Sequence, residues 1–166
     1  MGAGRVGFIK PFEYSRIESN LLAGRNPLTA EDIDCLIAEG VTHILDLREP
    51  REWTAPWVGE EALAAIEQRG LHRLHVRVED MGAPGMVAFD QAVEFLETAL
   101  QDPKSQVYVH CRAGMERTAA ILVAWYARRN NVSYEEALSA LRLRRRILAP
   151  LPNQERATRQ WLKLRL

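Results

Sequence analysis

A cysteine and an arginine six positions apart are the residues of this chain best placed to do chemistry. They lie in the segment His110-Cys111-Arg112-Ala113-Gly114-Met115-Glu116-Arg117-Thr118. The apolar, β-branched residues 106–109 predict a buried strand before this segment, and the apolar residues 119–127 predict a buried helix after it. Cys111 is therefore expected at the end of a strand, facing the N-terminus of a helix.

Such a position favours a bound oxyanion and an ionised thiol. A helix N-terminus leaves amide donors unpaired and carries a partial positive charge, and the loop before it adds inward-facing amides. Gly114 lets the loop close tightly, and Arg117 offers a planar pair of donors that matches two phosphate oxygens. The same positive field favours the thiolate of Cys111, which is the nucleophilic form. The sequence therefore predicts attack of sulfur on a bound phosphoryl group.

The segment resembles the HCxxGxxR[ST] signature of the cysteine-dependent protein tyrosine phosphatase superfamily. The chain length and the Arg-Thr ending resemble the small dual-specificity branch, which includes compact bacterial and archaeal members. The resemblance implies that Cys111 is the nucleophile of a phosphocysteine mechanism and that Arg117 holds the phosphate. It assigns phosphate binding to Arg112, Ala113, Gly114, Met115, Glu116 and Arg117.

The same resemblance gives roles to the residues at the two ends of the signature. It implies that the Thr118 hydroxyl donates to the thiolate when the thiolate leaves, and that His110 orders the loop and tunes the thiol. The alternatives are a threonine that bonds only locally in the first helical turn and a core histidine paired with backbone.

Cleavage of a phosphate ester also requires a proton donor, because an unprotonated alkoxide or phenoxide leaves poorly. The thiol loop contains no good donor. Asp80 lies about thirty residues before Cys111, on a predicted strand-to-helix loop where the resembled family carries its general acid. We assign Asp80 as the acid that protonates the leaving oxygen and later activates water. The alternatives are that Asp80 only fixes a turn and that Glu79 is the acid.

Other polar residues receive weaker assignments. Gln154 resembles the water-positioning amide of some relatives, with Gln160 as a substitute, whereas Asn153 suits a helix cap. Arg48 ends a predicted strand and is interpreted as a structural ion-pair residue. Cys35 is interpreted as a small core residue, with a reversible disulfide to Cys111 as the alternative. The basic run Arg142, Arg144, Arg145 and Arg146 is interpreted as a solvated helix end.

Strands are predicted to alternate with helices. We expect strands at 12–17, 21–24, 41–47, 71–78 and 106–109, and helices at 29–40, 60–69, 86–100, 119–129, 133–144 and from about 152 to the C-terminus. Thr29 caps the first helix, and Ser133 with Glu136 forms a capping box. The predicted fold is α/β, with a central, mostly parallel sheet of four to five strands flanked by helices on both faces.

Composition bounds the remaining possibilities. The 166 residues, 47% of them apolar, fit a single catalytic domain over 1–166. Lys+Arg and Asp+Glu balance at 22 each, which gives no argument for nucleic acid or membrane as a partner. Two cysteines and no signal-like or membrane-spanning stretch predict a reducing, cytoplasmic location. We expect neither a metal nor a cofactor, phosphorylated proteins or small phosphoesters as substrates, and oxyanions as inhibitors.

Three functions are compared. The first is a phosphatase acting on phosphotyrosine, and on phosphoserine and phosphothreonine where the pocket is shallow. The second is another cysteine-loop enzyme, either a rhodanese-like sulfurtransferase, whose loop is usually shorter, or an arsenate reductase, which needs further cysteines. The third is a non-catalytic phosphate reader. Glu116 inside the loop opposes a multiply charged headgroup, which argues against a polyphosphoinositide substrate.

Overall fold

The computed structural model describes residues 12–49, 52 and 59–165. Its strands are β1 (Tyr14–Glu18), β2 (Leu21–Gly24), β3 (His43–Asp46), β4 (His72–His75) and β5 (Val107–His110). Its helices are α1 (Ala30–Ala38), α2 (Glu60–Gln68), α3 (Met86–Gln101), α4 (Arg117–Asn130), α5 (Tyr134–Arg144) and α6 (Pro152–Arg165).

The strands of the described residues form one sheet in the order β1-β2-β5-β3-β4. Only the β1–β2 pair is antiparallel, and β5 lies parallel to both β2 and β3. The register pairs His110 with Gly24 on one side and with Asp46 on the other. The carboxyl ends of three central strands are therefore level, which is where ligands bind in such sheets.

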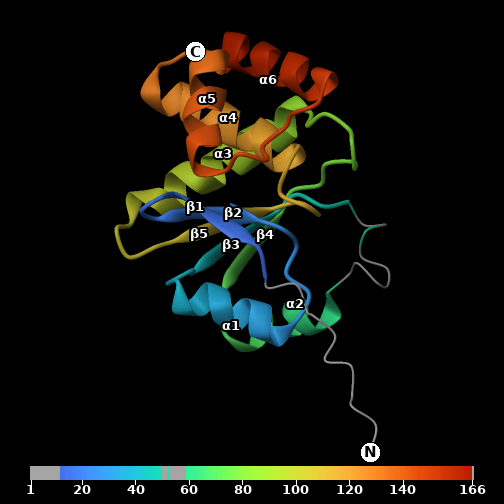
Figure 1. Ribbon diagram of the computed structural model, residues 1–166, viewed down its shortest axis with the longest axis vertical. Coiled ribbons are helices and arrows are strands. Elements are labelled where there is room, and N and C mark those ends of the chain that lie inside the picture. Colours follow the sequence, from blue (N-terminus) through green and yellow to red (C-terminus); the bar gives the residue numbers. More distant parts are fainter. Residues whose placement is uncertain (1–11, 50–51, 53–58, 166) are drawn as a thin grey trace, which may run out of the picture.

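Helices cover both faces of the sheet, as predicted. Figure 1 shows α1 and α2 below the sheet and α3, α4, α5 and α6 above it. One core cluster includes Leu22, Ile33 and Ile44 on the α1–α2 side. A larger cluster on the other side surrounds α4, whose residues from Arg117 to Trp125 are all buried. The helix that follows the Cys111 loop is thus held inside the molecule.

The predicted helix caps at Thr29 and Ser133 are confirmed. Thr29 accepts from the Asp32 amide in a capping box, and Ser133 and Glu136 form a second one. The predicted strand 71–78 is shorter as β4, but the chain still follows β3, because Val76 N donates to Asp46 O (2.9 Å) and Val78 N to Leu47 O (3.3 Å). This extension delivers Asp80 to the active edge of the sheet.

Two sequence predictions are wrong. Cys35 is exposed rather than a core residue, because Ile33 and Leu36 face the sheet and a position two residues from Ile33 points roughly 200° around the helix. Asn153 lies within the first turn of α6 and does not precede it as a cap. None of the described helices has an apolar stretch long enough to cross a bilayer.

Candidate active site

The loop between β5 and α4 turns its carbonyl groups outward. Each carbonyl oxygen from residue 111 to residue 116 accepts a hydrogen bond from a donor outside the loop. The oxygens of residues 111–113 accept from His110 Nδ1 (2.9 Å), Asn26 N (2.8 Å) and Arg145 Nη2 (3.1 Å), in that order. Those of residues 114–116 accept from Arg145 Nε (2.9 Å), Ala149 N (2.8 Å) and Ala120 N (3.0 Å).

This pattern leaves a ring of free amides on the inner side of the loop. In a trans peptide the N–H points away from the C=O, so outward carbonyls direct the following amides inward. In the described structure, the amides from Ala113 to Glu116 donate to no protein acceptor. Gly114 has φ +68°, and a Cβ there would lie 2.3 Å from the Gly24 oxygen, so the tight loop requires glycine. Four amides are thus available for an anion.

Cys111 lies at the base of this ring. The residue is 1% exposed, and Thr118 Oγ1 donates to its sulfur at 3.2 Å from the first turn of α4. His110 is buried, and its Nδ1 must carry the hydrogen because its partner, the Cys111 oxygen, can only accept. Burial lowers the pKa of His110 to about 4 despite the opposing effect of Asp46, so the ring is neutral near pH 7. Thr118 thus contacts the Cys111 sulfur, whereas His110 contacts the Cys111 backbone, a geometry that also fits the alternative of a core histidine paired with backbone.

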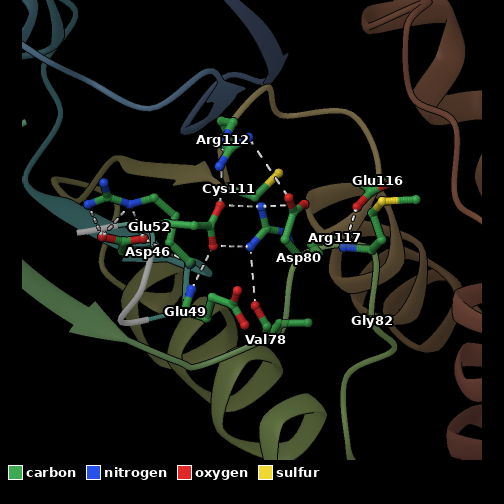
Figure 2. Close-up of polar contacts among 12 residues, drawn as sticks. Asp46, Glu49, Glu52, Val78, Asp80, Gly82, Cys111, Arg112, Glu116 and Arg117 are labelled. Atoms are coloured by element: carbon green, nitrogen blue, oxygen red, sulfur yellow. Dashed lines mark hydrogen bonds and ion pairs between the residues drawn. The ribbon is translucent and has the colours of Figure 1, made fainter. Parts of the chain in front are cut away.

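Arg117 lies beside the sulfur between two carboxylates (Figure 2). Glu52 accepts from its Nη1 at 2.6 Å and from its Nη2 at 2.8 Å, and Asp80 Oδ1 lies 3.1 Å from Nη2. A fourth contact runs from Nη1 to Val78 O at 3.1 Å. Burial alone would lower the pKa of Arg117, but the Glu52 hydrogen bonds and the charges of Cys111 and Asp80 raise it. The guanidinium is therefore charged and is held in one orientation by these contacts.

The two acids on Arg117 differ in exposure. The Glu52 side chain is 2% exposed, whereas that of Asp80 is 30% exposed. Asp80 lines a cavity of about 390 Å³ together with Cys111, Arg112 and Arg117, and Glu79 is exposed and does not line it. Of the two candidate acids, the structure therefore brings only Asp80 to the cavity that Cys111 lines. The sequence analysis missed Glu52, which lies among other charged residues (Arg48, Glu49 and Arg51) in a segment with no periodic signal.

Two side chains at the start of α6 hold the loop that carries Asp80. Gln154 is fully buried, and its Nε2 donates to Gly82 O at 3.0 Å while its Oε1 accepts from Leu151 N at 2.9 Å. Asn153 Nδ2 donates to Met81 O at 3.1 Å. Gln154 thus lies behind the acid loop, not in the cavity, and Gln160 is exposed.

The ion-pair interpretation of Arg48 is confirmed. Its Nη2 lies 2.7 Å from Asp46 Oδ2, and both side chains are buried. Arg73 reaches the same oxygen at 2.7 Å, and His110 Nε2 lies 3.9 Å from it. The network joins the ends of β3, β4 and β5 beneath the loop. Among the described residues, no group of three or more His, Cys, Asp or Glu is arranged to hold a metal ion.

Comparison with known proteins gives a consistent result. The family model described as "Dual specificity phosphatase, catalytic domain" matches residues 25–163. Dual specificity protein phosphatase 26 of Bos taurus is 30% identical over 110 residues, which cover 66% of this chain and 49% of the relative. Dual specificity protein phosphatase 1 of Mus musculus is 37% identical over 62 residues, covering 37% of this chain and 17% of the relative. The chain thus spans half or less of these curated relatives.

Solved structures share the fold over nearly their whole length. PTPMT1 in complex with PI(5)P superposes with a TM-score of 0.76 at 26% identity, covering 91% of this chain and 95% of that one. Tk-PTP in the active form has a TM-score of 0.77 at 23% identity, covering 95% and 100%.

Proposed function

Because the chain belongs to the dual specificity phosphatase catalytic domain family, we propose that it hydrolyses phosphoric monoesters of protein side chains through a phosphocysteine intermediate. The observation that carries the proposal is the ring of free amides over the Cys111 sulfur with Arg117 beside it. Donors fixed in this way stabilise the charge on the equatorial oxygens of a transferring phosphoryl group without reorganisation.

The first step forms a sulfur–phosphorus bond and breaks the ester bond. The Cys111 thiolate attacks phosphorus, and the leaving oxygen takes a proton from Asp80, which ends as a carboxylate. In the second step a water attacks phosphorus and gives its proton to Asp80. The sulfur–phosphorus bond breaks, and Thr118, 3.2 Å from the sulfur, stabilises the returning thiolate. Inorganic phosphate leaves and the starting protonation states are restored.

The test is turnover of p-nitrophenyl phosphate by the wild type and by Cys111→Ser. The variant should lose turnover while still binding phosphate, and acid quenching of the wild type should trap a phosphocysteine. Cys35→Ser is the matched control, because Cys35 is an exposed cysteine on α1 outside the cavity, and it should retain full activity. Turnover at the wild-type rate by Cys111→Ser would refute the mechanism.

A phosphoinositide is the second candidate substrate, because PTPMT1 is solved in complex with PI(5)P. The cavity favours the side chain of phosphotyrosine, since Met81, Met115 and Leu151 line it with apolar surface that an aryl ring can contact. A panel of phosphotyrosine, phosphoserine and phosphothreonine peptides, PI(5)P and small phosphates separates the two. Thiosulfate and arsenate, added to the panel, test the sulfurtransferase and arsenate reductase alternatives, which the relatives do not favour.

The remaining expectations extend this proposal. Phosphate and other oxyanions should inhibit competitively, because they fill the same amide ring. A thiolate nucleophile and two free cysteines suit a reducing cytoplasm. The family match from residue 25 to residue 163 supports one catalytic domain. The balanced charge supports substrate recognition without nucleic acid or membrane.

A further inference from the structure

Glu116 occupies the N-cap position of α4 but does not cap the helix. An N-cap side chain ordinarily accepts from an amide in the first helical turn, and here no such hydrogen bond forms. The carboxylate instead reaches out of the phosphate-binding loop, and its Oε1 accepts from Met81 N at 2.9 Å. Met81 directly follows Asp80. The phosphate loop, residues 111–116 between β5 and α4, therefore holds the backbone next to Asp80, and α4 is left without a side-chain cap.

The backbone at Met81 needs such support. Met81 has φ +62°, in the left-handed region that a residue with a side chain rarely adopts. Its side chain is 64% exposed, so buried apolar contacts do not anchor the residue. Glu116 accepts a hydrogen bond from its amide, and Asn153 Nδ2 donates to its oxygen at 3.1 Å. Two side chains from different elements thus hold one strained residue by both of its peptide groups.

We propose that Glu116 is a positioning residue that, through the Met81 amide, holds the Asp80 carboxyl beside the leaving oxygen. The inference rests on the proposed phosphatase function and adds a link between its two loops. The phosphate loop binds the phosphoryl group with its amides and sets the place of the proton donor with its one acidic side chain. Without that bond, the left-handed turn relaxes and Asp80 loses its alignment with the ester oxygen, while the amides and Arg117 still bind phosphate.

The experiment compares two substrates that differ in how much they need an acid. p-Nitrophenolate leaves readily without protonation, whereas phenolate needs the proton. Glu116→Ala should lower kcat/KM for phenyl phosphate roughly 10–100-fold, less than the roughly 10²–10⁴-fold of complete general acid catalysis because Asp80 is misaligned and not removed, and lower that for p-nitrophenyl phosphate by a much smaller factor. Glu116→Gln is the matched variant, because its amide oxygen can still accept from Met81, and it should restore most of the phenyl phosphate activity.

Two further variants keep the inference falsifiable. Asp80→Asn should show the same substrate difference, and adding Glu116→Ala to it should cause little further loss, because both changes remove one function. Asn153→Ala removes the other Met81 contact from outside the phosphate loop and should act in the same direction. An equal loss on both substrates in Glu116→Ala, or a Glu116→Gln variant as impaired as Glu116→Ala, would overturn the inference. Failure of the proposed function looks different, because the wild type would then turn over neither substrate.

Discussion

Arg145 supports the anion-binding loop from outside, and its replacement by methionine is the most informative perturbation of that loop. The side chain is 1% exposed. Its Nε donates to Gly114 O at 2.9 Å and its Nη2 to Ala113 O at 3.1 Å. Its other bonds go to Glu13 and to Ser15 Oγ (3.0 Å) near β1. Arg145→Met keeps the apolar stem and removes every one of these donors.

The magnitude follows from the two carbonyls that lose their donors. An unsatisfied buried acceptor costs about 1–3 kcal/mol, which applies in full to the buried Gly114 oxygen and only in part to the oxygen of the exposed Ala113, so the free energy of unfolding should fall by about 1–4 kcal/mol. Glu13 adds little to the loss, because its side chain is 50% exposed and can be hydrated. The two peptide groups that lose support carry the amides of Gly114 and Met115. If one of these amides no longer points at the bound oxyanion, a hydrogen bond to a charged acceptor is lost, which costs about 1.5–3 kcal/mol. Oxyanion binding should then weaken roughly 10–100-fold.

The assays are urea unfolding for stability and calorimetric titration with phosphate for affinity. Arg146→Met is the matched control, because Arg146 is the next residue, is exposed and makes no polar contact with the described residues. It should change neither quantity by more than about 0.5 kcal/mol. Glu13→Gln leaves the two bonds to the loop intact and should cost less than about 1 kcal/mol. An Arg145→Met protein with wild-type stability and phosphate affinity would refute the reasoning.

Three other predictions concern the buried groups around the nucleophile. Glu52→Gln should lower the free energy of unfolding by about 3 kcal/mol, because the buried Arg117 keeps its charge and loses a carboxylate partner. Added phosphate should raise the melting temperature of this variant more than that of the wild type. Equal shifts in the two proteins would contradict the prediction. Thr118→Val should slow hydrolysis of the phosphocysteine roughly 10–100-fold, visible as a larger burst followed by a slower steady state; an unchanged ratio of burst to steady-state rate would argue against this role. Burial lowers the pKa of His110 from 6.5 to about 4, so between these pH values the unfolded chain binds a proton that the folded chain does not. The free energy of unfolding should therefore fall by about 3 kcal/mol as the pH drops from 7 to 4. In His110→Asn, the urea midpoint should change less steeply with pH across this range.

The features that the sequence predicted are those set by neighbouring residues. The strand–loop–helix around Cys111, the Thr29 cap and the capping box of Ser133 and Glu136 each depend on groups within a few positions of one another. Sequence periodicity also predicted the α/β architecture with a mostly parallel sheet. Asp80 could be chosen because the chemistry demands an acid and the resembled family supplies a place for it. These inferences need no knowledge of which distant segments meet.

The support of the loop depends on contacts between distant segments, and the sequence did not reveal it. Glu52 is 65 residues from Arg117, and Arg145 is 132 residues from Glu13. The basic run was interpreted as a solvated helix end, which holds for Arg142, Arg144 and Arg146, all exposed, but not for the buried Arg145. The four side chains are chemically alike, so their sequence does not distinguish them. Arg145 is the residue after the end of α5 at Arg144, and its extended backbone accompanies its inward position.

The full set of charged side chains around the cavity indicates which substrates it favours, beyond the effect of Glu116 alone. Arg112 and Arg117 are paired with the carboxylates of Glu52 and Asp80, Glu116 adds a third acid to the cavity, and the described lining carries no further cation. One phosphoryl group can use the amides and Arg117, but a second phosphate on the same substrate would meet the carboxylates with only Arg112 as a cationic partner. The remaining lining is apolar. We therefore expect discrimination between substrates to come from the group that carries the phosphate, with an aryl ring gaining contacts that a multiply phosphorylated inositol cannot make.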